Sequence, residues 1–92
     1  MSRPPNIIFI GKKPIMTYVN ATLTLLSNEP VVTIKARGKS IATAVDVSQM
    51  IVKRLNAVGY KVGGVRIFSE RLTSQDGKDR NVSTIEVDVS GP

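Results

Sequence analysis

The first half of the chain joins a short apolar run to a segment with helical periodicity. Residues 6–10 are mostly apolar, and the Gly-Lys-Lys-Pro sequence at 11–14 interrupts them. Apolar side chains then recur at spacings of three and four, at Met16, Val19, Leu23 and Leu26. This spacing places them on one face of a helix. Pro14 suits the first turn of that helix, where a missing N–H costs nothing.

A second strand and a second helix follow. Residues 31–37 are rich in β-branched side chains, and alternation places Lys35 and Arg37 on one face of a strand. Ser40 is expected to act as an N-cap, and Gly59 as the C-terminal cap after a helix that ends near Ala57. One face of this helix is expected to carry residues at helical spacing that are all apolar except Ser48: Ile41, Ala44, Val45, Ser48, Ile51, Val52 and Leu55.

The last third of the chain predicts a long β-hairpin. Residues 61–73 form an extended segment whose Gly63-Gly64 pair indicates a bulge. An Asp-Gly pair within 74–78 is typical of a hairpin turn, and residues 80–89 alternate cleanly between apolar and polar. The element order is therefore βαβαββ. It predicts an α+β two-layer sandwich with a four-stranded mixed sheet and two helices on one face.

The outer part of the hairpin differs from the rest of the chain. Residues 69–81 are almost entirely polar, with Leu72 the exception. Because this segment has little to bury, we expect the hairpin to protrude as an arm. An ordinary long exposed loop is the alternative.

Composition limits the chain to one domain spanning residues 1–92. A domain of this size has a thin core, so dimerisation would help it. The chain has no Cys and no His, which excludes disulfides, the usual zinc sites and histidine acid–base chemistry. Residues 1–6 show no secretory signal and no run is long enough for a membrane span, so a cytoplasmic protein without membrane contact is expected.

The net charge of +6 is unevenly distributed. Residues 1–66 carry ten basic side chains against only Glu29 and Asp46, whereas residues 67–92 carry three basic and five acidic ones. Such separation favours one basic face that binds a polyanion, although a surface tuned for solubility is the simpler alternative.

Two basic segments follow the first two strands. Gly11 to Pro14 carries Lys12 and Lys13, and each lysine alone could be a chance surface residue. A second cluster, Lys35, Arg37 and Lys39, lies at the next junction from strand to helix. Parallel strands end at the same sheet edge, so the two segments should form a single phosphate-binding patch.

The remaining motifs do not indicate an enzyme. Gly38-Lys39-Ser40 resembles the end of a P-loop, but Thr33 stands where that motif requires glycine. The serines lack a histidine, and Tyr18 and Tyr60 are expected to pack rather than to stack on bases. We therefore expect neither catalysis, nor a cofactor, nor a metal.

Three longer runs resemble a known family. The runs IIFIGKKPIMTYV, IKARGKSIATAVD and LTSQDGKDRNVSTIEV are similar, in order and spacing, to the Alba family of archaeal chromatin proteins. The resemblance implies a homodimer that binds double-stranded DNA and RNA with little sequence preference. It implies phosphate contacts from the basic residues of the two loops, which are Lys12, Lys13, Lys35, Arg37 and Lys39. It also implies contacts from a hairpin that reaches along the minor groove and carries Arg71, Lys78 and Arg80.

The resemblance also carries expectations about regulation and assembly. Lys12 matches a lysine whose acetylation weakens binding in the family. Leu55 stands where members that join dimers side by side have Phe, so dimer–dimer contact is expected to differ here. The chain is similar to the divergent second copy in some archaea. An architectural protein associated with the nucleoid is the first hypothesis. An RNA chaperone or ribonucleoprotein subunit, and a heterodimer partner of a paralogue, are the alternatives.

Overall fold

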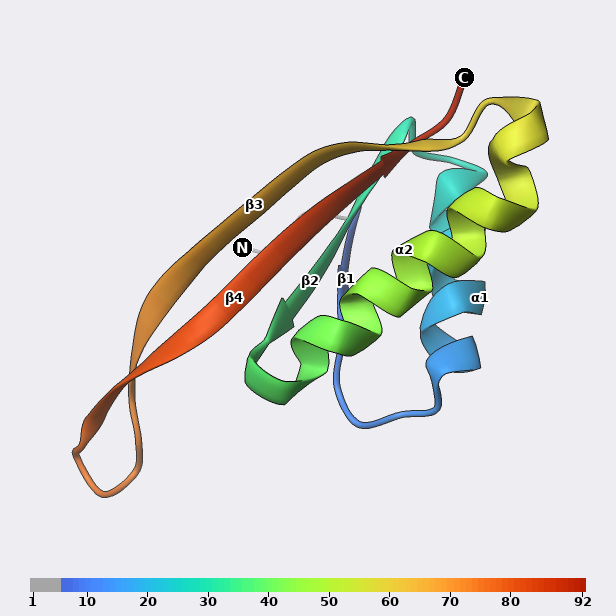
Figure 1. The fold of residues 1–92 in the computed structure, drawn as a ribbon. Coiled ribbons are helices and arrows are strands. Elements are labelled where there is room, and N and C mark those ends of the chain that lie inside the picture. Colours follow the sequence, from blue (N-terminus) through green and yellow to red (C-terminus); the bar gives the residue numbers. More distant parts are fainter. Residues whose placement is uncertain (1–5) are drawn as a thin grey trace.

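The computed structural model describes residues 6–92, which form one four-stranded sheet with two helices packed on it (Figure 1). In chain order the elements are β1 (Ile7–Phe9), α1 (Ile15–Leu26), β2 (Val31–Arg37), the 3₁₀ turn η1 (Gly38–Ser40), α2 (Ile41–Leu55), the 3₁₀ turn η2 (Asn56–Val58), β3 (Lys61–Thr73) and β4 (Asp79–Ser90). The predicted βαβαββ order and two-layer α+β class are confirmed. The absence of a secretory signal was inferred chiefly from residues 1–5, which lie outside the described residues.

The sheet has the strand order β1-β2-β4-β3. β1 runs parallel to β2, with Ile8 opposite Ile34, and β4 lies between β2 and β3, antiparallel to both. The alternating pattern of β4 suits its place beside β2, because the apolar side chains of the two strands lie opposite each other on the same face of the sheet. The paired apolar positions are Val89 with Val32, Val87 with Ile34 and Ile85 with Ala36.

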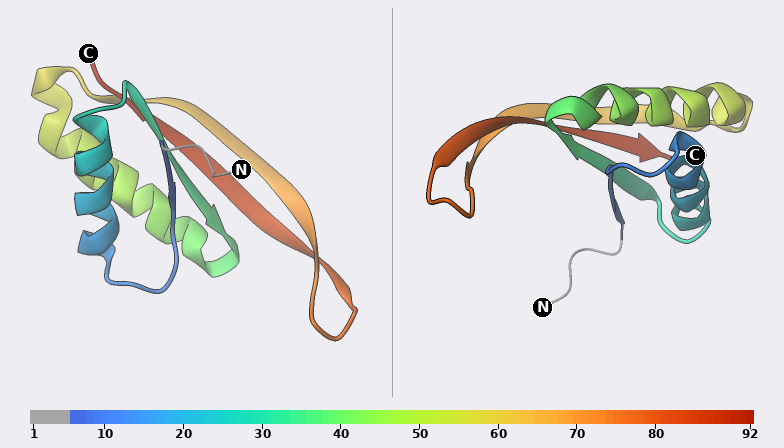
Figure 2. Two further views of the ribbon diagram at one scale, coloured as in Figure 1. Left: turned by 180° about the vertical axis from the view of Figure 1, so that it is seen from behind. Right: turned by 90° about the horizontal axis from the view of Figure 1, so that it is seen from below.

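Both helices cover the same face of the sheet and leave the other face open (Figure 2). The core between the layers is built mainly from β-branched residues, including Val32 and Ile34 of β2, Val19 of α1, and Val47 and Ile51 of α2, all almost completely buried. Burial of each such side chain contributes about 1.5–3 kcal/mol relative to exposure. An aliphatic core of this kind fits a chain with 4% aromatic residues.

Three predictions about the helices are wrong in detail. Val45, expected on the apolar face of α2, is 40% exposed, and Val47 is buried instead. Met16, expected on the buried face of α1, is 39% exposed, and the buried face instead includes Tyr18 and Thr22. The Thr22 hydroxyl donates to the Tyr18 carbonyl at 2.7 Å, so a polar side chain can occupy that position. Ser40 precedes α2, but its side chain caps no backbone N–H because η1 already gives it a helical conformation.

The β3–β4 hairpin extends well beyond the helices, which confirms the predicted arm (Figures 1 and 2). The molecule accordingly measures 48 × 29 × 23 Å. The predicted bulge lies between Val62 and Val65, and Gly59 adopts the expected left-handed conformation at φ 104° after η2. Within residues 6–92, no helix has the length and apolarity needed to cross a membrane.

Candidate nucleic-acid interface

The ends of β1 and β2 bring two basic loops to one end of the sheet. The strands are parallel, and the Ile10 N–H still donates to the Lys35 carbonyl at 2.9 Å just before the chain turns away. The loop that follows β1 exposes Lys12 and Lys13, and η1 exposes Lys39. We call these three lysines the basic end. Among residues 6–92, none of the three forms an ion pair, so their charges are available.

The loop that carries Lys12 and Lys13 is fixed by Tyr18. The backbone N–H groups of Gly11 and Lys13 both donate to the Tyr18 hydroxyl, each at 2.9 Å. Tyr18 is 7% exposed, so its ring is anchored in the core. A Cβ at Gly11 would lie 3.2 Å from that hydroxyl, a tight contact that favours glycine there. The sequence predicted a packing role for Tyr18 but not these hydrogen bonds.

The second basic loop turns sharply after Arg37. Gly38 has φ +56°, which favours glycine because it has no Cβ. Arg37 is exposed, yet it is not free. Its Nε donates to Glu70 Oε1 at 3.2 Å and its Nη2 to Glu70 Oε2 at 3.0 Å. Of the cluster predicted from sequence, Lys39 is therefore exposed at the end of the sheet, whereas Arg37 is paired with a carboxylate.

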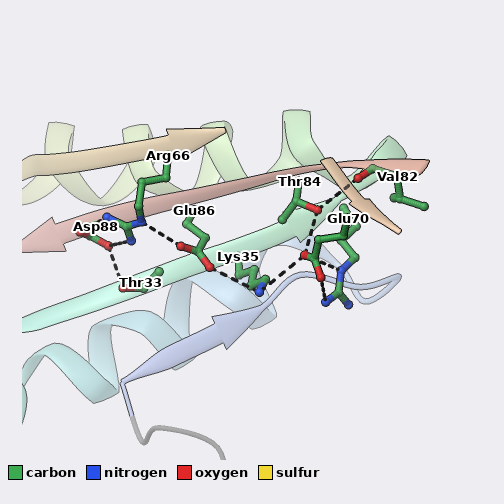
Figure 3. A network of polar contacts seen from close by, with 9 residues as sticks. Thr33, Lys35, Arg66, Glu70, Val82, Thr84, Glu86 and Asp88 are labelled. Carbon is green, nitrogen blue, oxygen red and sulfur yellow. Dashed lines mark hydrogen bonds and ion pairs between the residues drawn. The ribbon is translucent and has the colours of Figure 1, made fainter. Parts of the chain in front are cut away.

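The open face of the sheet carries a chain of ion pairs (Figure 3). Lys35 Nζ lies 3.4 Å from Glu86 and 3.7 Å from Glu70. Arg66 contacts Glu86 and Asp88, each at 2.8 Å. The hydrogen bond from Arg66 lowers the pKa of Glu86 and of Asp88, and Arg37 does the same for Glu70.

Lys35 is the most enclosed of the predicted phosphate contacts. Its side chain is 17% exposed, and its ammonium group lies 6.0 Å from the centre of the Phe9 ring and 5.7 Å from that of Phe68. With aromatic rings on two sides and two carboxylates nearby, Lys35 lies within the open-face network rather than at the basic end.

The arm carries the last three predicted contacts. Its turn is closed by the Ser74 N–H, which donates to the Lys78 carbonyl at 2.9 Å, and by Gly77 at φ 83°. Arg71 pairs with Asp79 at 3.0 Å. Lys78 and Arg80 are exposed and, within the described part of the chain, have no ion-pair partner.

Three further observations concern Leu55, possible metal ligands, and the carboxylates of the open face. Leu55 lies at the end of α2, half-buried against the core, so its role in dimer–dimer contact stays a prediction. No cluster of three or more potential metal ligands occurs among the residues described. The acidic side of the open face was missed at the sequence level, because those carboxylates meet Lys35 and Arg37 only once β4 pairs with β2 and β3.

A βαβαββ sandwich with a projecting hairpin, and with lysines at one sheet end that have no ion-pair partner within residues 6–92, defines a class of small basic proteins. Comparison with known proteins identifies the family. The Alba family profile matches residues 6–69. The chain belongs to the Alba family. The match ends before Arg71, Lys78 and Arg80, so the outer arm lies outside it.

Individual relatives in sequence and structure support the same family assignment. The chain is 58% identical over 82 residues to the DNA/RNA-binding protein Alba of Nitrosopumilus maritimus, covering 89% of this chain and 86% of that protein. It is 40% identical over 84 residues to the protein of the same name in Methanococcus maripaludis, covering 89% and 93%. Among solved structures, Alba from Thermoplasma volcanium superposes with a TM-score of 0.82 at 42% identity, covering 92% of this chain and 99% of that one. Alba1 from Trypanosoma brucei gives 0.71 at 28% identity, covering 98% and 72%.

Proposed function

We propose that this protein binds double-stranded DNA and RNA through their phosphate backbones, with little dependence on sequence. The observation that carries the proposal is the basic end, where Lys12, Lys13 and Lys39 are exposed and unpaired among residues 6–92. Lysine ammonium groups bind phosphates as point charges and read no base, so such a surface favours any polyanionic backbone. Two of the relatives above are named DNA/RNA-binding proteins, which supports the same function here.

The arm extends this surface. Lys78 and Arg80 lie at and just after the turn between β3 and β4, and the arm projects away from the helices (Figure 1). Its outer part, residues 69–81, is almost entirely polar. We assign it a second set of backbone contacts along a groove. Arg71 contributes less, because Asp79 holds it in an ion pair.

The functional unit that we propose is a homodimer. β3 is an edge strand, and its Val65 and Ile67 side chains are 55% and 78% exposed. Ile67 also lines an open cleft of about 350 Å³, together with Ile41, Ile85 and others. An exposed apolar strip of this kind on a small domain suits a second copy of the chain. A paralogue with the same strip would form a heterodimer instead.

A dimer with two basic ends and two arms would act as an architectural protein on the chromosome, within the cytoplasm. Acetylation of Lys12 would remove one unpaired charge from the basic end and weaken binding. A ribonucleoprotein role remains the alternative, since the same unpaired lysines serve either nucleic acid and the relatives' names include both.

The salt dependence of binding tests the proposal. If each dimer neutralises roughly six phosphates, log affinity should fall against log salt with a slope of about −5 for duplex DNA. Titrations of a duplex DNA and a duplex RNA of the same mixed sequence, and of a scrambled duplex, would measure the slope and the preference. A flat salt response, or a strong preference for one sequence, would contradict the proposal.

A further inference from the structure

Glu70 holds the guanidinium of Arg37 as a phosphate would. Both carboxylate oxygens are engaged, at 3.2 and 3.0 Å from Nε and Nη2. Carboxylates and phosphates pair with arginine in the same bidentate geometry. One of the two edges with which Arg37 could bind a phosphate is therefore occupied by the protein itself.

Other contacts fix Glu70 in that position. The Thr84 hydroxyl, which is buried, donates to Glu70 Oε1 at 3.0 Å, and Lys35 Nζ lies 3.7 Å from the same oxygen (Figure 3). The hydrogen bond from Arg37 is the main cause that lowers the pKa of Glu70. Glu70 is thus charged at neutral pH.

The network as a whole is electrically balanced. The three cations Lys35, Arg37 and Arg66 face the three anions Glu70, Glu86 and Asp88. The basic end has no such compensation among the described residues. Arg37 differs from the other cations of the network in its position. Its side chain is 41% exposed, compared with 48% for Arg66 and 17% for Lys35, but only Arg37 stands next to η1, where a polyanion on the basic end would pass.

We propose that Glu70 is an internal competitor for phosphate at Arg37 and thereby sets the affinity of the basic end. This inference rests on the proposed function. A nucleic acid gains the contribution of Arg37 only by displacing the Glu70 carboxylate from the guanidinium or by sharing the cation with it. The protein therefore binds more weakly than its number of cations indicates, because each Arg37 contacts phosphate only in the fraction of complexes in which Glu70 is displaced or shares the cation.

Replacement of Glu70 by Gln tests the inference, because the amide keeps the shape and an oxygen for Thr84 but loses the charge. Affinity for a short DNA duplex of mixed sequence should rise about two- to fivefold, the range for an exposed ion pair. The salt slope should steepen by up to about one ion per subunit. Glu29→Gln is the matched control. It removes the same charge from the turn between α1 and β2, at the other end of the sheet, and should change affinity far less.

A double-variant cycle shows whether Glu70 acts through Arg37. Arg37→Gln should lower affinity, and in that background Glu70→Gln should add no more than Glu29→Gln does. Equal gains from the two Glu→Gln variants, or an undiminished gain without Arg37, would overturn the inference. Failure of the wild-type protein to show salt-dependent binding would instead overturn the proposed function.

A measurement on the wild-type protein tests the inference even if the Glu70→Gln substitution destabilises the hairpin. The Arg37 Nε–H signal in NMR spectra of the wild-type protein should report the ion pair with Glu70 and should shift on addition of the duplex. An unchanged signal at saturation would show that phosphate never reaches the guanidinium, which also overturns the inference.

Discussion

At the scale of single residues, the structure separates cations by what surrounds them. Lys12 and Lys13 stand on a loop held by the Tyr18 hydroxyl, and no carboxylate pairs with them among residues 6–92. Lys35 and Arg37 are close in sequence to Lys39, the third lysine of the basic end, and equally basic, yet each contacts Glu70. Availability to a phosphate therefore depends on the neighbours that the fold supplies, and a count of basic residues overestimates it.

Removal of the Tyr18 hydroxyl should loosen the first basic loop without changing any charge. Tyr18→Phe loses the acceptor for two backbone N–H groups, so we expect the free energy of unfolding to fall by about 1–3 kcal/mol. Amide exchange at Gly11 and Lys13 should accelerate, and duplex affinity should fall a few-fold. Tyr60→Phe is the matched control. Chemical denaturation, hydrogen exchange and duplex titration measure these effects, and unchanged exchange at both amides would refute the role.

The charges on that loop should matter more than equal charges elsewhere. Replacing Lys12 and Lys13 together by Ala should weaken binding to every duplex by a similar factor and flatten the salt slope by about two ions per subunit. The control is the Lys53/Arg54→Ala pair at the end of α2, which removes the same net charge from exposed positions. If both double variants lose affinity equally, the basic end has no special role.

At the scale of elements, periodicity predicted the helices and strands to within a few residues, because the chain has a thin, one-sided core. It failed where a polar group replaced an apolar one. Tyr18 and Thr22 occupy the buried face of α1 in place of Met16, and hydrogen bonds to their polar groups make that possible. The pattern of apolar and polar residues also could not predict which residues of neighbouring strands lie opposite one another. Alternation assigned Glu86 and Asp88 to one face of β4, but only the pairing of β4 with β2 and β3 brings them to Lys35 and Arg66.

The open-face network should make stability depend on acid. The pKa values of Glu70, Glu86 and Asp88 are lowered in the folded state, chiefly by hydrogen bonds from arginine. The unfolded chain therefore binds more protons, so the stabilisation is present above the ordinary carboxyl pKa of about 4 and is lost as pH falls through the lowered values. Urea denaturation from neutral pH to about pH 2 should show this fall. Arg66→Gln removes the donor to Glu86 and Asp88, so the free energy of unfolding should fall less steeply with pH in this variant. A pH profile identical to that of the wild type would contradict a role for these ion pairs.

At the scale of the whole molecule, the sheet has two different edges. β1 is three residues long, whereas β3 has thirteen residues and exposes Val65 and Ile67 on the side where the helices lie. The helices leave both side chains largely uncovered, and the arm continues past the first turn of α2 (Figure 2). A long edge strand with uncovered apolar side chains is a surface that proteins normally pair or protect. The simplest complement is the same surface on a second copy, which would also double the basic ends.

Ile67→Glu should therefore convert a dimer into a folded monomer. Ile67 is 78% exposed in the single chain, so a charge there costs little to the fold but cannot be buried against a symmetry mate. We expect sedimentation at micromolar concentration to show the wild type as a dimer and the variant at half its mass, with unchanged circular dichroism. Val58→Glu, at an exposed apolar position in η2, is the control and should stay dimeric. The monomer should bind duplex DNA with about half the salt slope, since one basic end and one arm remain. A wild type that sediments as a monomer would place the second basic end on another protein and favour the heterodimer.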